Sequence, residues 1–401
     1  MPTIQIRDNL KTEFSDVYTP EVLAAMGVLS RFNADQKQAM TDRARRRGRR
    51  MAEKQSLDFL DPGDVIPRTS ITVQEARDGQ FDGSEIPHDL QRQWIQGTGP
   101  GAKPNSTLEN SIRNVAYALL SGADGWMFDG EDALGQIATM SLDNQRNLKM
   151  AIARDPVFLA AAEAVSAGMN RWSRDVFGDE KIVDWKQQLG FTTKIFRARG
   201  LHLDDRHVRD GDGVAMSASI VDLATYVGNN YLQLRQDGAS IVLYLPKIQT
   251  AGEAALWNDM LAALENHLGL SDGTIKVYVL VEQLEATYQL MEIRAVLGRH
   301  FIGFNTGRWD YINSVADAMA WDDAFVQPNI ESITMTYGYM RNYEDRVRRC
   351  VNTPDRNGNC ALWQGGMEPN IPVGSAAGVA ESMNKAVAGA EREQREGASG
   401  K

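Results

Sequence analysis

Acidic side chains follow two short apolar runs of the sequence, and they are the residues best suited to chemistry. One run leads into Gly303–Ile312, in which glycines precede an Arg-Trp-Asp cluster that ends at Asp310. An apolar run that breaks into glycines is typical of a buried strand ending in a polar loop. Lys276–Val281 has a similar form and is followed by Glu282. Two carboxylates therefore stand at the ends of successive predicted strands.

Glu282 and Asp310 are candidate ligands for a hard divalent cation. Two carboxylates can hold Mg²⁺ while most of its octahedron stays open to water and substrate. An arginine nearby would stabilise charge that develops on an enolate oxygen. A single carboxylate at a strand end more often caps a helix or forms a salt bridge. The hypothesis therefore depends on the joint occurrence of further polar residues at predicted strand ends, namely Asp129, Glu131, Asp132, Arg197, Arg199 and Lys247.

Three other polar or aromatic residues near these strand ends have open interpretations. His202 is either a structural hydrogen-bonding group or a ligand, and neither alternative is favoured. Trp309 and Tyr311 follow the glycines of the loop, and we interpret both as packing residues.

Short apolar runs alternate with helical patterns from Trp94 onward, which predicts the elements that position these residues. Seven runs are found: Trp94–Gly97, Gly125–Asp129, Thr193–Leu203, Ser240–Leu245, Lys276–Val281, Phe301–Phe304 and Ala361–Gly365. The alternation predicts an α/β fold with a parallel sheet, and so many repeats favour a TIM-like β/α barrel over an open sheet. Its active site would lie at the carboxyl ends of the strands. A closed barrel needs eight strands, so either the closing strand comes from elsewhere or the chain is incomplete.

The chain is expected to contain three regions. Residues 1–90 are polar, rich in helical patterns and interrupted by proline and aspartate, which predicts an N-terminal helical layer. Residues 91–375 would form the β/α barrel. Residues 376–401 would form a C-terminal helix and a flexible tail.

Composition and charge limit the possible functions. With 401 residues, 43% of them hydrophobic, the chain can bury the core of a soluble globular protein. Its formal net charge of −10 disfavours nonspecific binding of nucleic acid. The arginine-rich run Arg43–Arg50 departs from this acidic balance. We interpret it as the solvated face of a helix, with a site for a phosphate-bearing ligand or an acidic partner surface as alternatives.

Cysteine usage and hydropathy predict a cytoplasmic protein. The two cysteines, Cys350 and Cys360, have no histidine at metal-ligand spacing. This pattern indicates neither a disulfide framework nor a zinc site, and it favours a reducing compartment. No apolar stretch approaches membrane-spanning length, and the N-terminal residues lack the pattern of a signal peptide.

The loop Phe304–Ile312 resembles the signature of A-type malate synthases, the magnesium-dependent enzymes that condense acetyl-CoA with glyoxylate on a β/α barrel. The resemblance extends from about residue 20 to the end of the chain. Other segments agree in the order of the family: Thr98–Pro100, Phe128–Asp132, Phe196–Gly200, Tyr244–Lys247, Leu256–Asp259, Gly365–Met367 and Ile371 with Pro372.

The resemblance implies a role for each candidate residue. Glu282 and Asp310 would hold Mg²⁺, which would bind a 2-oxo acid through its carboxylate and carbonyl oxygens. Arg197 would stabilise the enolate of the acyl thioester. Asp129 and Glu131 would order metal-bound water or neighbouring arginines. Three consecutive residues would bind the substrate: Gly307, Arg308 and Trp309.

The chain also departs from the family in several respects. Malate synthases continue with a last barrel strand and a C-terminal helical domain, whose aspartate removes the α-proton of acetyl-CoA. We expect this chain to lack both, and with them a counterpart of the catalytic base of the family. Gln249 stands where a glutamate is common, Thr306 replaces a cysteine or alanine, and Gly101–Thr107 differs from the Lys-Met-containing turn of the family. The substrate can therefore differ even if the metal site is kept.

Three kinds of function remain open. The first is an Mg²⁺-dependent enzyme that makes or breaks a C–C bond between an acyl-CoA and a 2-oxo acid such as glyoxylate, with the missing base supplied by a partner subunit. The second is a lyase or hydrolase of CoA esters or 2-hydroxy acids that uses its own base. The third is a non-catalytic binding or structural protein. The joint presence of Glu282, Asp310 and Arg197 favours an enzyme, either an acyltransferase or a related lyase.

The missing closing strand also predicts an assembly. An open barrel edge would leave backbone donors and acceptors unpaired, and proteins normally cover such edges. We therefore expect a homo-oligomer or a heteromeric partner chain, with no membrane and no nucleic acid among the partners.

Overall fold

The computed structural model describes residues 4–99, 103, 106–132, 139–368 and 375–401. Pro100, most of residues 101–107, and Ile371 with Pro372 belong to motifs discussed above and lie outside the described residues. The chain divides into two compact units. The first unit contains Met1–Asn33, Pro87–Tyr244 and Ala263–Leu270, and the second contains Ala34–Ile86, Leu245–Ala262 and Ser271–Lys401.

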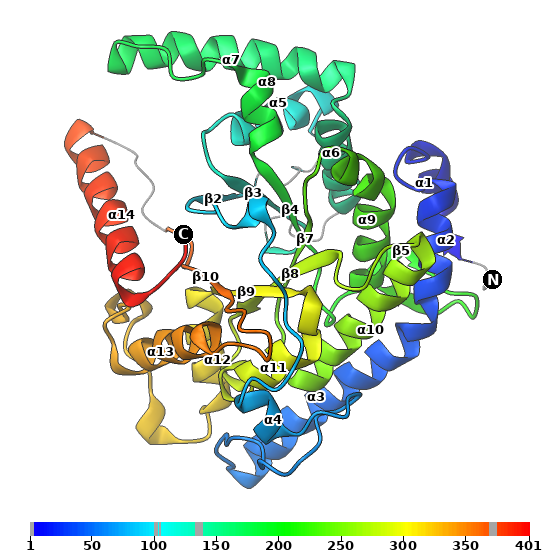
Figure 1. Ribbon diagram of the computed structural model, residues 1–401, viewed down its shortest axis with the longest axis vertical. Helices are drawn as coiled ribbons and strands as arrows, with labels where there is room; N and C mark the ends of the chain where they lie inside the picture. The colour runs from blue at the N-terminus through cyan, green and yellow to red at the C-terminus, as the bar shows by residue number, and fades with distance from the viewer. Residues whose placement is uncertain (1–3, 100–102, 104–105, 133–138, 369–374) are drawn as a thin grey trace. The chain divides into compact units, whose positions relative to one another are not determined.

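Four parallel strands cross the first unit in the order β2-β3-β4-β7 (Figure 1). They are β2 (Gln96–Thr98), β3 (Gly125–Asp129), β4 (Thr193–Arg197) and β7 (Ile241–Leu245), the last of which ends one residue into the second unit. Every residue of β7 is buried, which is typical of a parallel strand covered on both faces. The register places Asp129 of β3 opposite Arg197 of β4. Two candidate residues therefore lie side by side where their strands end.

Helices and a small antiparallel sheet complete the first unit. The helix α7 illustrates how the sequence sets the ends of these elements. Asp155 caps its first turn, Pro156 occupies the first helical position, and Gly178 ends it in a left-handed conformation. The helices are α1 (Asp8–Glu13), α2 (Pro20–Leu29), α5 (Leu108–Leu119), α6 (Met140–Ala153), α7 (Pro156–Phe177), α8 (Trp185–Phe191) and α9 (Ala218–Gln236). The antiparallel strands are β1 (Gln5–Ile6), β5 (Asp204–Arg209) and β6 (Ala215–Ser217).

The second unit contains three parallel strands in the order β8-β9-β10. They are β8 (Ile275–Val281), β9 (Phe301–Thr306) and β10 (Leu362–Gln364). Its helices are α3 (Asn33–Glu53), α4 (Val73–Arg77), the first part of α10 (Ala251–Leu268), α11 (Leu290–Leu297), α12 (Arg308–Ala318), α13 (Gly338–Asn352) and α14 (Ala376–Glu396). Val281 and Thr306 are register partners at the ends of β8 and β9. The segments that follow these two strands, with Glu282 and Asp310, therefore start from neighbouring positions.

The seven predicted strands are all present, and the predicted α/β class is confirmed. The main difference is the run Thr193–Leu203, which is a strand only as far as Arg197. The strand ends there because the backbone N–H of Arg199 donates to the side chain of Asp222 at 2.8 Å and not to a neighbouring strand.

One edge of β10 is contacted by residues from the end of the chain. Ser399 donates its backbone N–H to the carbonyl of Trp363 at 2.7 Å, and Gly365 donates to the carbonyl of Gly400 at 2.8 Å. Gln364 and Gly400 form a parallel bridge. Ser399 and Gly400 thus run in the direction that a next parallel strand would take. The predicted partner chain remains a prediction.

The arginine-rich run lies on α3, and several of its arginines bind carboxylates of the second unit. Arg43 and Arg46 contact Glu253 at 2.6 and 3.0 Å, and Arg50 contacts Glu285 at 2.7 Å. The interpretation as a solvated face is therefore wrong for Arg43 and Arg50, which are largely shielded from solvent. It fits Arg45, whose side chain is exposed and pairs with Asp42 on the same helix.

None of the described helices combines the length and the apolar character needed to cross a membrane.

Candidate active site

The first unit holds one cluster of candidate residues, built on the ends of β3 and β4. Arg197 Nε donates to Asp129 Oδ1 at 2.7 Å, and Arg197 Nη2 donates to Asp129 Oδ2. Both side chains are buried, with 9% and 4% of their surface exposed. The parallel register brings the two residues together, because each is the last residue of its strand. We call Asp129, Glu131, Asp132, Arg197 and His202 the arginine cluster.

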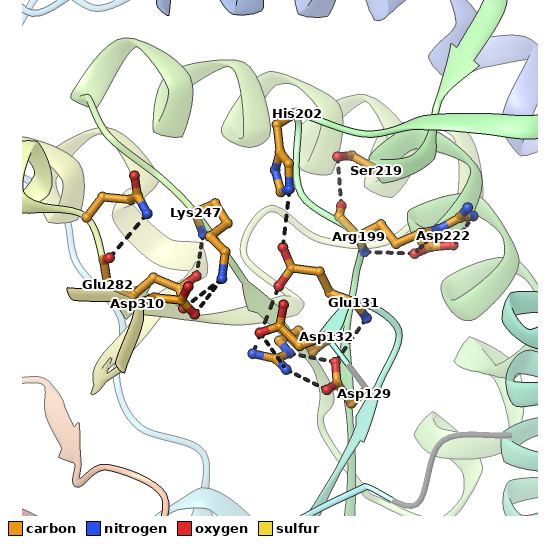
Figure 2. A network of polar contacts seen from close by, with 12 residues as sticks. Asp129, Glu131, Asp132, Arg199, His202, Ser219, Asp222, Lys247, Glu282 and Asp310 are labelled. Carbon is orange, nitrogen blue, oxygen red and sulfur yellow. Dashed lines mark hydrogen bonds and ion pairs between the residues drawn. The ribbon is translucent and has the colours of Figure 1, made fainter. Parts of the chain in front are cut away.

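The remaining members of the arginine cluster lie around this bidentate pair. Asp132 lies 3.3 Å from Arg197 Nη2, and Glu131 Oε2 lies 4.0 Å from Nη1. Glu131 also faces His202, with 3.6 Å between Oε1 and Nε2 (Figure 2). Burial acts to lower the pKa of Arg197, but the hydrogen bonds and charge of Asp129 outweigh it and raise that pKa above its usual value. The cluster thus contains a permanent cation.

A second buried arginine fixes the chain that follows β4. Arg199 donates through Nε and Nη2 to Asp222 at 3.0 and 2.7 Å, and through Nη2 to Asp205 at 2.7 Å. Ser219 donates its hydroxyl to the carbonyl of Arg199 at 2.8 Å (Figure 2). Burial raises the pKa of Asp222, and Arg199 opposes this change. Asp205 and Asp222 were missed by sequence reasoning, because nothing in their local pattern distinguishes them from surface carboxylates.

The second unit holds the other candidate residues, which converge on one ammonium group. Lys247 Nζ lies 2.7 Å from Asp310 Oδ2 and 3.3 Å from Glu282 Oε2 (Figure 2). The backbone N–H of Lys247 also donates to Glu282 Oε1 at 2.7 Å. Glu282 is buried, with 1% of its side chain exposed, whereas 39% of the Asp310 side chain is exposed. We call Glu282 and Asp310 the carboxylate pair.

A glycine at the start of α12 allows this convergence. A Cβ atom on Gly307 would lie 2.8 Å from the Cβ of Glu282, which is closer than side-chain atoms approach. Asp310 stands in the first turn of α12, where the helix dipole favours a negative charge. The loop therefore needs glycine at this position for packing, besides any contact it makes with a substrate.

The side chains next to Gly307 contact other parts of the protein. Arg308 donates through Nη2 to the carbonyl of Ile333 at 2.7 Å, and its guanidinium lies 4.4 Å from the centre of the Trp309 ring. Tyr311 is buried and stacks on Tyr343 at 4.0 Å, which confirms its predicted packing role. Burial raises the pKa of Tyr311 to about 12. The Arg308 side chain is therefore held by contacts within the protein.

The donor set of the carboxylate pair fits a magnesium ion. Oxygens of both residues lie within 3.3 Å of one cationic nitrogen, so the fold already directs two carboxylates at one positive charge. Carboxylate oxygens are the ligands that hard divalent cations prefer, and Mg²⁺ commonly binds one or two of them. Lys247 was recognised as a strand-end residue, but its contact with both carboxylates could not be read from its position in the sequence.

The fold and these clusters define a protein of the β/α-barrel class with charged groups at its strand ends. A family model described as "Malate synthase, TIM barrel domain" matches residues 193–401. The chain belongs to this family, which confirms both the resemblance and the barrel fold.

Curated relatives agree along the chain. A malate synthase of Myxococcus xanthus (strain DK1622) is 29% identical over 100% of this chain and 66% of the relative. Malate synthase A of Escherichia coli (strain K12) is 32% identical over 80% of this chain and 54% of the relative. The chain therefore spans two thirds or less of the length of these relatives. A Haloferax volcanii malate synthase solved as a magnesium/glyoxylate complex matches 77% of this chain and 71% of its own, with 14% identity and a TM-score of 0.45.

Proposed function

We propose that this chain is the barrel part of an Mg²⁺-dependent enzyme that forms or breaks a C–C bond between an acyl-CoA and a 2-oxo acid. Acetyl-CoA and glyoxylate are the substrates to test first, because the chain belongs to the malate synthase family. The observation that carries the proposal is the convergence of Glu282 and Asp310 on a single cationic group.

The second unit would bind the metal and the 2-oxo acid. Glu282 and Asp310 would hold Mg²⁺, which when bound would draw electrons from the carbonyl group of the 2-oxo acid. The first N–H groups of a helix have no acceptor within that helix, and they lie at the positive end of its dipole. In α12 these groups follow Gly307, so the backbone of Arg308 and Trp309 would bind the substrate carboxylate.

The arginine cluster would act on the acyl thioester. Arg197 stays protonated at any physiological pH, so it can stabilise the negative charge that develops on the thioester oxygen when the α-proton leaves. Asp129 holds the guanidinium in a fixed orientation through two hydrogen bonds. Glu131 would bind ordered water. The base that accepts the α-proton would come from a partner chain.

A related lyase or hydrolase that uses its own base is the second candidate. His202 and Glu131 support it, because an imidazole 3.6 Å from a buried carboxylate is suited to moving a proton. Activity of the purified chain without any other protein would favour this alternative over the need for a partner.

The test is a calorimetric titration of Mg²⁺ and then glyoxylate into the purified chain. We expect glyoxylate to bind only when Mg²⁺ is present. The substitution Glu282→Gln should remove both binding events, because it takes away a buried negative charge. Glu381→Gln is a suitable control, since Glu381 pairs with Lys385 on the exposed surface of α14.

Thioester consumption should then be measured with acetyl-CoA, alone and with proteins that co-purify from the native source. Turnover that needs a co-purifying protein would support the proposed partner. A chain that binds neither Mg²⁺ nor glyoxylate would contradict the proposal and leave a binding or structural role for the barrel.

A further inference from the structure

The loop between β7 and α10 links the carboxylate pair to the arginine-rich face of α3. We propose that Arg43 and Glu253 are positioning residues, which fix Lys247–Gln249 and through this loop orient Glu282. The inference rests on the proposed function, since it assigns these two residues to the metal site. It also gives the arginine-rich run a specific role.

On one side, the loop is held by Glu253. The backbone N–H of Gln249 donates to Glu253 Oε2 at 2.8 Å. Arg43 binds the same carboxylate through Nη2 at 2.6 Å and Nε at 3.2 Å, and it also donates to the backbone carbonyl of Lys247. The Arg43 guanidinium therefore holds both the Glu253 carboxylate, which accepts from Gln249, and the loop backbone at Lys247.

On its other side, the loop contacts the metal-site residues. The backbone N–H of Lys247 donates to Glu282 Oε1 at 2.7 Å, and the side chain of Gln249 donates to Gln283 at 3.0 Å. Lys247 adopts a left-handed conformation with φ of 55°, which is uncommon for a residue other than glycine. Contacts on both sides are what keeps the backbone in this conformation. The orientation of Glu282 thus depends on an N–H group that Arg43 and Glu253 hold in place.

The burial of these residues makes the arrangement rigid. Only 3% of the Glu253 side chain and 15% of the Arg43 side chain are exposed, whereas Arg46, the other partner of Glu253, is 44% exposed. A buried carboxylate is stable as an anion only when it is paired and hydrogen-bonded. Loss of Arg43 would leave Glu253 with the more mobile Arg46, and the loop would lose its contact at Lys247.

The test compares three variants on one helix: Arg43→Met, Arg43→Lys and the control Arg45→Met. Residues that orient a metal ligand through a hydrogen bond typically change metal affinity by about 10- to 100-fold when they are replaced. Arg43 acts one contact further from Glu282, through Lys247, so we expect Arg43→Met to weaken Mg²⁺ binding by about 10-fold, the lower end of this range. Arg43→Lys should restore only part of the affinity, because an ammonium group lacks the planar fork that reaches both Glu253 and Lys247. Arg45→Met should bind Mg²⁺ like the wild type.

Amide hydrogen exchange at Lys247 and Gln249 gives a readout that does not depend on metal. Arg43→Met should speed exchange at these two amides in the metal-free protein, whereas a purely structural role would lower the melting temperature without a local effect. Unchanged exchange at both amides, or unchanged Mg²⁺ affinity in folded Arg43→Met, would overturn the inference. If the wild type binds no Mg²⁺, the proposed function and the metal-site role fail together. Faster exchange in Arg43→Met would then show that Arg43 holds the loop but has no role in a metal site.

Discussion

The two clusters of candidate residues differ in the cation that each holds. In the arginine cluster, a buried guanidinium forms a bidentate pair with Asp129. In the carboxylate pair, the cation is the ammonium of Lys247, at the end of a flexible side chain. Guanidinium is planar and matches a carboxylate with two parallel hydrogen bonds, whereas ammonium is a mobile point charge. The comparison teaches that a bidentate guanidinium is held more firmly than an ammonium, and under the proposed function the ammonium would be the cation that gives way to a metal ion.

The arginine cluster and the carboxylate pair also differ in how far solvent reaches them. Asp129 and Arg197 are both buried, so water has little access to the pair between them. Within the carboxylate pair, Glu282 is buried but Asp310 is 39% exposed. Under the proposed function, one ligand would therefore be fixed by the protein, and the other would be open to a hydrated ion. This combination suits Mg²⁺, which gives up its water reluctantly.

The largest expected effect is the loss of metal binding in Asp310→Ala. The substitution removes the carboxylate that is open to solvent, so only Glu282 would remain to hold the ion. Mg²⁺ binding should no longer be detectable by calorimetry. Asp317→Ala is a matched control, because Asp317 lies on the same helix and its side chain is also 39% exposed. Equal Mg²⁺ affinity in wild type and Asp310→Ala would remove the metal-site assignment.

The substitution Asp129→Asn should mainly affect stability. It breaks a buried ion pair and leaves Arg197 poorly compensated, which typically costs about 3 to 5 kcal/mol in the free energy of unfolding. Denaturant unfolding would measure this cost. Asp132 contacts the same arginine from a half-exposed position, so Asp132→Asn should lower the free energy of unfolding by about 1 kcal/mol or less. Similar losses in both variants would mean that the cluster is not organised around the Asp129–Arg197 pair.

The smallest expected effect is a few-fold tightening of Mg²⁺ binding in Lys247→Met. Its ammonium contacts Asp310 and Glu282 and would compete with an ion bound there, so its removal should favour the metal. The metal-free protein should lose stability at the same time and regain it when Mg²⁺ is added. Lys276→Met is the control, since Lys276 donates to the Ser84 hydroxyl and the Arg299 carbonyl. Weaker Mg²⁺ binding in Lys247→Met would show that the two cations do not exchange.

The sequence allowed the strands and the residues at their ends to be predicted. Apolar runs mark buried parallel strands, and the residue after such a run lies at the edge where a barrel binds its ligands. Glu282 and Asp310 were found in this way. Arg197 and Asp129 were found separately, and their direct pairing needed the register of β3 and β4.

Contacts between distant parts of the chain could not be predicted. Arg43 and Glu253 are 210 positions apart, and neither has a local pattern that points to the other. The arginine run was therefore interpreted as solvated, although Arg43 is mostly buried. The Arg199–Asp222 pair could not be predicted either, because a carboxylate on a helix usually faces water.

The contact of Ser399 and Gly400 with β10 has a consequence for the order of folding. Its hydrogen bonds join Trp363 and Gly365 to residues some 35 positions later, while α3, from the start of the same unit, binds Glu253 and Glu285. Contacts of such large sequence separation form slowly, because the loops between them must close first. On the ribosome, the second unit therefore cannot complete its pairing until residue 400 has been synthesised. The salt bridges of α3 with Glu253 and Glu285 can form earlier, once those two residues have been synthesised.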